Sequence, residues 1–153
     1  MSVVLCVEVT LTIPDNEAET ALETLQRLGV PLAGLQRADL YRFELEPEAE
    51  EGLLKTLRGL ETIFNPNKHA LRVRESSAPQ RGEVWVDEVH PAGPPAAGDV
   101  RIAGRTLAGV VAVERFTAWL ALGADGGPAS PETLSRATET LLCNPAFQRA
   151  IPA

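Results

Sequence analysis

The sequence predicts an α+β protein made of two related halves in tandem. Apolar residues alternate with polar ones along strand-like segments, and apolar residues at helical spacing lie between these segments. The same patterns return later in the chain: LAGLQRADLYRFELE starts at Leu32, LAGVVAVERFTAWLA starts at Leu107, and Asn-Pro pairs follow at 65–66 and 144–145. Two matches in the same order indicate a degenerate tandem duplication.

The first half begins with a strand and a helix. Alternating apolar residues predict a strand from Val3 to Ile13 with one buried face. Pro14 ends this strand, Asp15 can cap the following helix, and Gly29 suits the position just after it. The apolar stripe of this helix comprises Ala18, Ala21, Leu22, Leu25 and Leu28.

A second strand region, a second helix and a closing strand complete the first half. Residues 33–45 have room for a bent or broken strand, and residues 71–73 make a short last strand. We expect the second helix to end at Asn65-Pro66, because proline disfavours the helical conformation in the residue before it. The order β-α-β-β-α-β is ferredoxin-like, with two helices on one face of an antiparallel sheet.

The second half keeps only part of this pattern. Val84 and Val86 suit its first strand, residues 110–122 form an extended apolar segment, and Ser130 caps a last helix. Residues 91–99, PAGPPAAGD, are too rich in proline and glycine to form a helix. The first helix of this half is therefore largely lost.

Neither half is expected to be stable alone. A ferredoxin-like unit of this size buries only roughly 60% of its unfolded surface. We therefore divide the chain into repeat 1 (residues 1–78) and repeat 2 (residues 79–153), which form an intramolecular pseudo-dimer with one shared core.

Composition and charge narrow the class of protein. With 44% apolar and 23% charged residues among 153, the chain has the balance of a folded globular protein. The net charge of −7 argues against nucleic acid, because phosphate binding needs a basic face. The chain has neither an apolar run near the roughly 20 residues that span a bilayer nor a basic leader. We expect a cytoplasmic protein without a membrane partner, which the isolated Cys6 and Cys143 also suit.

The first half resembles PurS, the small subunit of formylglycinamidine ribonucleotide synthase. The similar features are the leading VEVTL strand, the helix ending in Leu28-Gly29, the strand around Tyr41, and the Asn65-Pro66 turn followed by LRV. The second half is similar only at residues 110–122 and at LLCNP (141–145). A tandem chain of this kind resembles the PurS-like N-terminal domain of the long, fused synthases.

The resemblance implies a non-catalytic subunit of de novo purine biosynthesis. It would bridge a PurL-like synthetase and a PurQ-like glutaminase for ammonia transfer, with no catalytic residue, metal or cofactor of its own, and self-association stays open. The expected partner contacts are Asn65, Pro66, Asn67, Lys68, His69, Arg72, Asn144, Pro145 and Phe147.

Two other classes of function stay open at this stage. A regulatory or small-molecule-sensing protein resembling ACT domains would have a ligand between the copies, although the first strand–helix turn, residues 13–16, has no glycine. An enzyme with its site between the copies would need a catalytic constellation. Of Asp87, Glu88 and His90 only Glu88 and His90 share a strand face, and two ligands are too few for a metal site. Cys143 at a helix C-terminus is poorly placed for a thiolate, so neither group supplies such a constellation.

Overall fold

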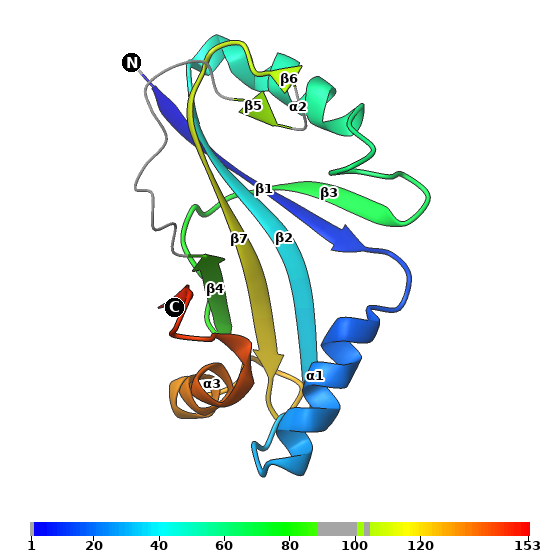
Figure 1. Ribbon diagram of the computed structural model, residues 1–153, viewed down its shortest axis with the longest axis vertical. Helices are drawn as coiled ribbons and strands as arrows, with labels where there is room; N and C mark the ends of the chain where they lie inside the picture. The colour runs from blue at the N-terminus through cyan, green and yellow to red at the C-terminus, as the bar shows by residue number, and fades with distance from the viewer. Residues whose placement is uncertain (1, 89–100, 103–104) are drawn as a thin grey trace. The chain divides into compact units, whose positions relative to one another are not determined.

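The chain contains both strands and helices, in a mixed α+β arrangement (Figure 1). The structure, a computed structural model, describes residues 2–88, 101–102 and 105–153. Its elements are β1 (Val3–Leu11), α1 (Asn16–Arg27), β2 (Gly34–Leu45), the 3₁₀ turn η1 (Pro47–Ala49), α2 (Glu50–Arg58), β3 (His69–Arg74), β4 (Glu83–Glu88), β5 (Arg101–Ile102), β6 (Arg105–Thr106), β7 (Val110–Leu122), α3 (Pro131–Ala137), the π-helical turn η2 (Thr138–Leu142) and β8 (Gln148–Pro152).

Among the described residues, six strands form one antiparallel sheet in the order β3-β1-β2-β7-β4-β8. Strands β5 and β6 pair separately. At one edge β1 pairs with β3, with Val7 opposite Val73. At the other edge β4 pairs with β8, with Val84 opposite Pro152. The α+β class predicted from the sequence is therefore confirmed.

The caps of α1 are those that the sequence predicts. The Asp15 carboxylate accepts hydrogen bonds from the backbone N–H groups of Glu17 and Ala18, at 3.1 and 3.2 Å. After the helix, Gly29 has a φ of 85°, a conformation that glycine adopts without steric cost. Leu28 differs from its prediction: it lies at the C-cap and is 57% exposed, so it does not belong to the buried stripe.

Two predicted boundaries are corrected by the structure. Residues 34–45 form one continuous strand, so of the bent or broken strand expected here the break is absent. Helix α2 ends at Arg58, and Gly59 follows as its C-cap, well before Asn65-Pro66. Glycine is a poor helix former, and the chain then turns through residues 60–64 with Phe64 N–H donating to Leu60 O.

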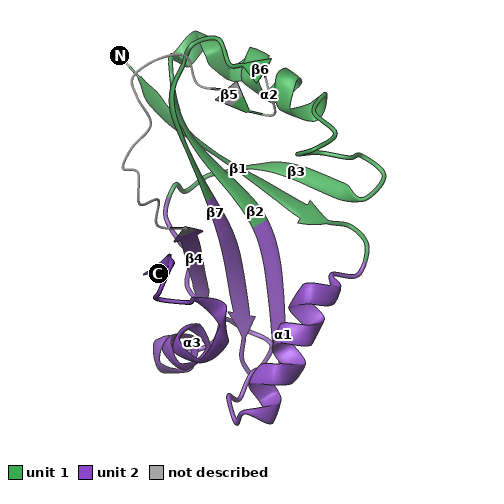
Figure 2. Cartoon of the chain, viewed as in Figure 1, with its two compact units in different colours: residues 1–13, 39–77, 92–115 green, residues 14–38, 78–91, 116–153 purple. Residues whose placement is uncertain are grey.

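The chain divides into two compact units, and each draws segments from both halves of the sequence (Figure 2). Unit 1 comprises residues 1–13, 39–77 and 92–115. Unit 2 comprises residues 14–38, 78–91 and 116–153. The division falls within β2 and within β7, so each of these long strands contributes one end to each unit.

Unit 1 has its own apolar core between α2 and the sheet. Leu107 and Val110 come from the second half of the sequence, and the other members come from the first half. The buried members are Leu5, Val7, Val9, Tyr41, Phe43, Leu45, Leu53, Leu57, Leu60, Ile63, Leu107 and Val110.

Unit 2 has a second core, to which both α1 and α3 contribute. Although the others come from the second half of the sequence, four of its buried residues come from the first half: Leu25, Val30, Leu32 and Leu35. The remaining members are Val84, Ala121, Ala129, Leu134, Ala137 and Leu142.

The two cysteines are not activated for chemistry. Cys6 is 2% exposed on β1, in agreement with the expected buried role. Cys143 is partly buried after η2, and burial raises the pKa of its thiol, which disfavours the reactive thiolate.

Neither a membrane span nor a metal cluster is found in the part of the chain that the structure describes. None of the helices there has the length and the apolar run that crossing a bilayer needs. No group of three or more metal-binding side chains occurs among these residues either. His90 of the Asp87–His90 candidate and the proline-rich segment 91–99 lie outside the described residues.

Tyr41, in the core of unit 1, is the only tyrosine of the chain, so its ionisation can be followed directly. Burial raises the pKa of Tyr41 above its usual value of 10.0; nearby Arg115 opposes this shift and Asp39 adds to it. The Arg115 guanidinium carbon lies 5.8 Å from the centre of the tyrosine ring.

Titration of the phenol is therefore expected to occur above pH 10.0 in the folded protein. Because the unfolded chain releases this proton first, the contribution of Tyr41 to stability is full below pH 10.0 and is lost as the pH rises through the folded pKa. Ultraviolet absorbance measures the titration, and urea unfolding of the wild type and of Tyr41→Phe measures the linked loss. A phenol that titrates at or below pH 10.0 would contradict this expectation.

Candidate functional site

The Asn65-Pro66 turn, one of the two expected contact sites, lies in unit 1 just before β3. The Asn65 side-chain oxygen accepts a hydrogen bond from Asn67 N–H at 2.9 Å, and its backbone oxygen accepts from Lys68 N–H and His69 N–H at 3.0 and 2.8 Å. The N–H of Asn65 donates to Nδ1 of His69 at 2.9 Å. Asn65 therefore stabilises the turn both as a hydrogen-bond acceptor and as a donor.

The Asn144-Pro145 turn in unit 2 has the same set of hydrogen bonds. Ala146 N–H donates to the Asn144 side-chain oxygen at 3.0 Å, and Phe147 N–H and Gln148 N–H donate to its backbone oxygen at 3.2 and 2.8 Å. The N–H of Asn144 donates to Oε1 of Gln148 at 2.8 Å. Gln148 therefore takes the place that His69 has in the first turn.

Both asparagine side chains have a structural task, since each closes its own turn through the carboxamide oxygen. This agrees with the simpler interpretation of the Asn-Pro pairs, in which the residue type is needed for the turn. The acceptor four residues later is a feature that the sequence alone did not reveal. Histidine and glutamine look unrelated in sequence, although each offers a side-chain acceptor at that position.

The remaining expected contact residues differ in their freedom to bind a partner. Lys68, Pro66 and Asn67 are exposed in unit 1, while Pro145 is exposed and Phe147 is 51% exposed in unit 2. Arg72 is already engaged, because its guanidinium lies 2.8 Å from the Glu8 carboxylate across β1 and β3. The structure thus brings Asn65–His69 together in one turn and Asn144–Phe147 in another.

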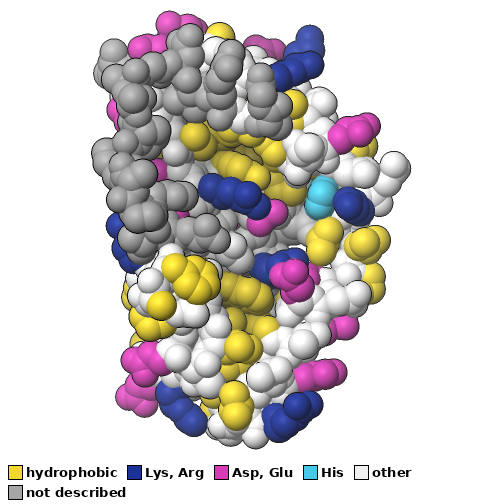
Figure 3. Space-filling view, viewed as in Figure 1, with side chains coloured by type: hydrophobic (Ala, Val, Ile, Leu, Met, Phe, Trp, Pro, Cys, Tyr) yellow, Lys and Arg dark blue, Asp and Glu magenta, His cyan; other side chains and the backbone are white. Residues whose placement is uncertain are grey.

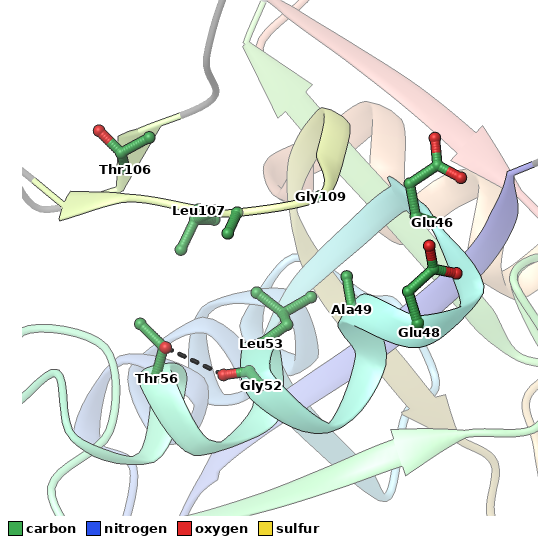
Figure 4. A pocket seen from close by; sticks show the side chains of 10 residues that line it. Glu46, Glu48, Ala49, Gly52, Leu53, Thr56, Thr106, Leu107 and Gly109 are labelled. Atoms are coloured by element: carbon green, nitrogen blue, oxygen red, sulfur yellow. Dashed lines mark hydrogen bonds between the residues drawn. The ribbon is translucent and has the colours of Figure 1, made fainter.

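Unit 1 also contains a cavity of about 430 Å³ beside α2 (Figure 4). One wall is α2 with the η1 turn before it, and the opposite wall is the segment 106–109. The two walls are tied together where Glu46 N–H donates to Gly109 O at 2.8 Å. Glu46 and Glu48 lie at one side of the cavity, and Leu53 and Leu107 extend from opposite walls (Figure 4).

Unit 2 has a more open groove of about 450 Å³ between α1 and η2, beside Trp119 of β7. The Arg37 guanidinium carbon lies 6.0 Å from the centre of the Trp119 ring. The same guanidinium forms two hydrogen bonds of 3.0 and 3.1 Å with the Asp15 carboxylate, and it also pairs with Glu17. Because Asp15 caps α1, this arginine joins the start of that helix to β2.

Charges are mixed on the face shown in Figure 3. Lys and Arg side chains alternate there with Asp and Glu side chains and form no continuous basic patch among the residues described on that face. Apolar side chains are visible between them. This face therefore has no electrostatic footprint of the kind that binds a phosphate backbone.

The fold and the two turns place the chain in the class of α+β proteins with helices packed on an antiparallel sheet. Comparison with protein-family models, with curated proteins and with solved structures gave no match.

Proposed function

We propose that the chain is a duplicated ferredoxin-like protein that serves as a PurS-like, non-catalytic assembly subunit. The observation that carries the duplication is the strand order β3-β1-β2-β7-β4-β8. Read from the β8 edge, the order begins β8-β4-β7, and read from the β3 edge it begins β3-β1-β2. Strands β8, β4 and β7 are the second-half counterparts of β3, β1 and β2. A tandem duplication would produce this repeated order.

The strand register supports the same duplication. Val7 pairs with Val73 in the first half, and Val84 pairs with Pro152 in the second. Val7 and Val84 are both fully buried, each in the core of its own unit. The displacement from 73 to 152 equals that from Asn65 to Asn144, and the two Asn-Pro turns have matching hydrogen bonds.

Each unit then corresponds to one ferredoxin-like fold in which part of the chain has been exchanged. In such a sheet the first strand lies between the last and the third, and the second strand forms the other edge. In unit 1 the first, last, third and second strands are β1, β3, β2 and β7, in that order. In unit 2 they are β4, β8, β7 and β2. The first helix and second strand of the first repeat therefore lie in unit 2, and the second strand of the second repeat lies in unit 1, as such segments would be exchanged between the subunits of a swapped dimer.

A binding role is the function that this architecture supports best. The chain is a pair of similar units, and each presents an exposed turn of the same construction. We infer that these turns contact a PurL-like synthetase and a PurQ-like glutaminase, and that the assembly passes ammonia between them. The assignment of these partners rests on the PurS resemblance of the first half, and the paired turns supply the surface.

Reversal of the charge at Lys68 is expected to weaken the association with such subunits while leaving the melting temperature nearly unchanged. Lys68 is exposed, and exposed charges contribute only about 0–1 kcal/mol to folding. Arg72 is unsuitable for this test, because a glutamate there would face Glu8. Co-purification of tagged Lys68→Glu with the synthetase and glutaminase subunits, in the presence of glutamine and nucleotide, measures the effect.

Lys55→Glu is the matched control, since Lys55 is also exposed on unit 1 but lies on α2, away from the turn. Normal binding by Lys68→Glu would remove the turn from the contact surface. If the wild type binds neither subunit while a small metabolite raises its melting temperature, the assembly function is wrong and the sensing alternative replaces it.

A further inference from the structure

The wall of the cavity beside α2 includes a glycine, Gly52, at a position where there is room for a side chain. Gly52 is the third residue of this nine-residue helix, and glycine is a poorer helix former than alanine. A Cβ at position 52 would have no atom within 4 Å, and the backbone there does not need a positive φ. Packing among the described atoms therefore does not explain the glycine, which lies in the wall of the open cavity.

The cavity is apolar at its base. Leu53 and Leu107 lie at this base but are only 4% exposed, so Ala49 and the exposed Ala108 supply further apolar surface on the two walls. Such a surface favours the aliphatic part of a ligand, because covering it removes apolar area from water. The volume of about 430 Å³ lies toward the small end of the range for ligand sites, so the aliphatic part must be short.

The charged side chains that line the cavity are all acidic. The lining includes the Glu46 and Glu48 carboxylates, and among its described residues there is no lysine, arginine or histidine. The Thr56 hydroxyl already donates to Gly52 O at 2.9 Å, so it offers lone pairs to a ligand. Glu50 and Glu51 add negative charge, and together the four carboxylates outweigh the roughly half positive charge of the helix N-terminus.

From this combination we propose that the cavity binds a basic group carried on a short aliphatic stem. The stem lies along Leu53 and Leu107, and the ammonium or guanidinium group faces Glu46 and Glu48. Such a group can belong to a free alkyl amine or to a lysine or arginine side chain of a protein. The inference rests on unit 1 alone and is independent of the assembly function.

Titration of the full chain with n-butylguanidinium and n-butylammonium tests the proposal, with backbone amide NMR signals of Gly52, Ala108 and Gly109 as the readout. We expect saturable shifts of these signals with both probes. 1-Butanol has the stem without the charge, and ammonium has the charge without the stem. Each is expected to bind about tenfold more weakly or worse, because a charge-assisted hydrogen bond or the apolar contact is lost.

Two variants test the cavity, one by filling its open space and the other by removing one of its charges. Gly52→Leu fills the open space with a better helix former, so binding should disappear while the melting temperature is kept or raised. Glu48→Gln should weaken binding about tenfold. Glu51→Gln is the matched control, because it removes the same charge from α2 outside the cavity lining and should bind as the wild type does.

A capped arginine peptide, acetyl-Ala-Arg-Ala-amide, distinguishes the two sources of the basic group. Binding as tight as that of n-butylguanidinium assigns the cavity to a side chain of a partner protein, whereas exclusion of the peptide assigns it to a free amine. The proposal is overturned if neither charged probe gives saturable shifts, if 1-butanol binds equally well, or if folded Gly52→Leu still binds.

Discussion

Residues 1–78, expressed without the rest of the chain, are expected to lack the cooperative unfolding transition of the full protein or to dimerise. The reason is that Leu25, Val30, Leu32 and Leu35 of this fragment are buried in unit 2 against residues of the second half. Burial of one such side chain contributes about 1.5–3 kcal/mol, so the four together account for about 6–12 kcal/mol. This is comparable with the total stability of a small domain, about 5–15 kcal/mol.

Circular dichroism during heating, with light scattering after gel filtration, measures both outcomes. A dimer of the fragment would restore the buried positions by exchange with a second copy. Co-expression with residues 79–153 is the control and should recover a complex that unfolds as the intact chain does. A monomeric fragment with the melting temperature of the full protein would show that the exchanged segment does not depend on the second half.

Gly109→Ala is expected to lower the unfolding free energy by about 2–4 kcal/mol, from backbone strain and steric overlap together. Gly109 has a φ of 76°, and a Cβ there would lie 2.6 Å from the Cβ of Ala49. The overlap would push the segment 106–109 away from the start of α2, where Glu46 N–H is bonded to Gly109 O. Urea unfolding of the wild type and the variant measures the difference.

Gly126→Ala separates the two causes. Gly126 has a φ of 82°, but a Cβ there would meet nothing within 4 Å. Its substitution should therefore destabilise by the backbone strain alone, about 1–2 kcal/mol. Equal losses for the two variants would mean that the contact with Ala49 relaxes freely and that the close approach of the two segments has no energetic weight.

Local structure was largely predictable, because it depends on residues near one another in the chain. The alternation from Val3 onward, the Asp15 cap and Gly29 together define β1 and α1, and the Ser130 hydroxyl caps α3 by accepting from Thr133 N–H at 3.2 Å. Where several local signals compete, the prediction was less exact. Gly59 ended α2 before proline could, and β2 is continuous where a bent or broken strand was expected.

The candidate site was predictable only in part for the same reason. Both Asn-Pro turns were recognisable from their residues, and the structure builds each of them around its asparagine. Their side-chain acceptors, His69 and Gln148, share a role but no residue type, so no sequence pattern marks them. The cavity beside α2 depends on the approach of segment 106–109, which is about fifty residues away along the chain.

The sequence by itself determined the α+β class, most of the elements and the caps that begin and end them, because propensity, periodicity and capping act over a few residues. Only the tertiary structure decided which core each segment enters. Leu32 and Leu107 belong to similar sequence segments, yet each is buried in a core formed mainly by the other half of the chain. The hydrophobic effect is non-directional, so burial against any apolar surface of the same area is about equally favourable. The partner is therefore chosen by the path of the long strands β2 and β7, which no local pattern encodes.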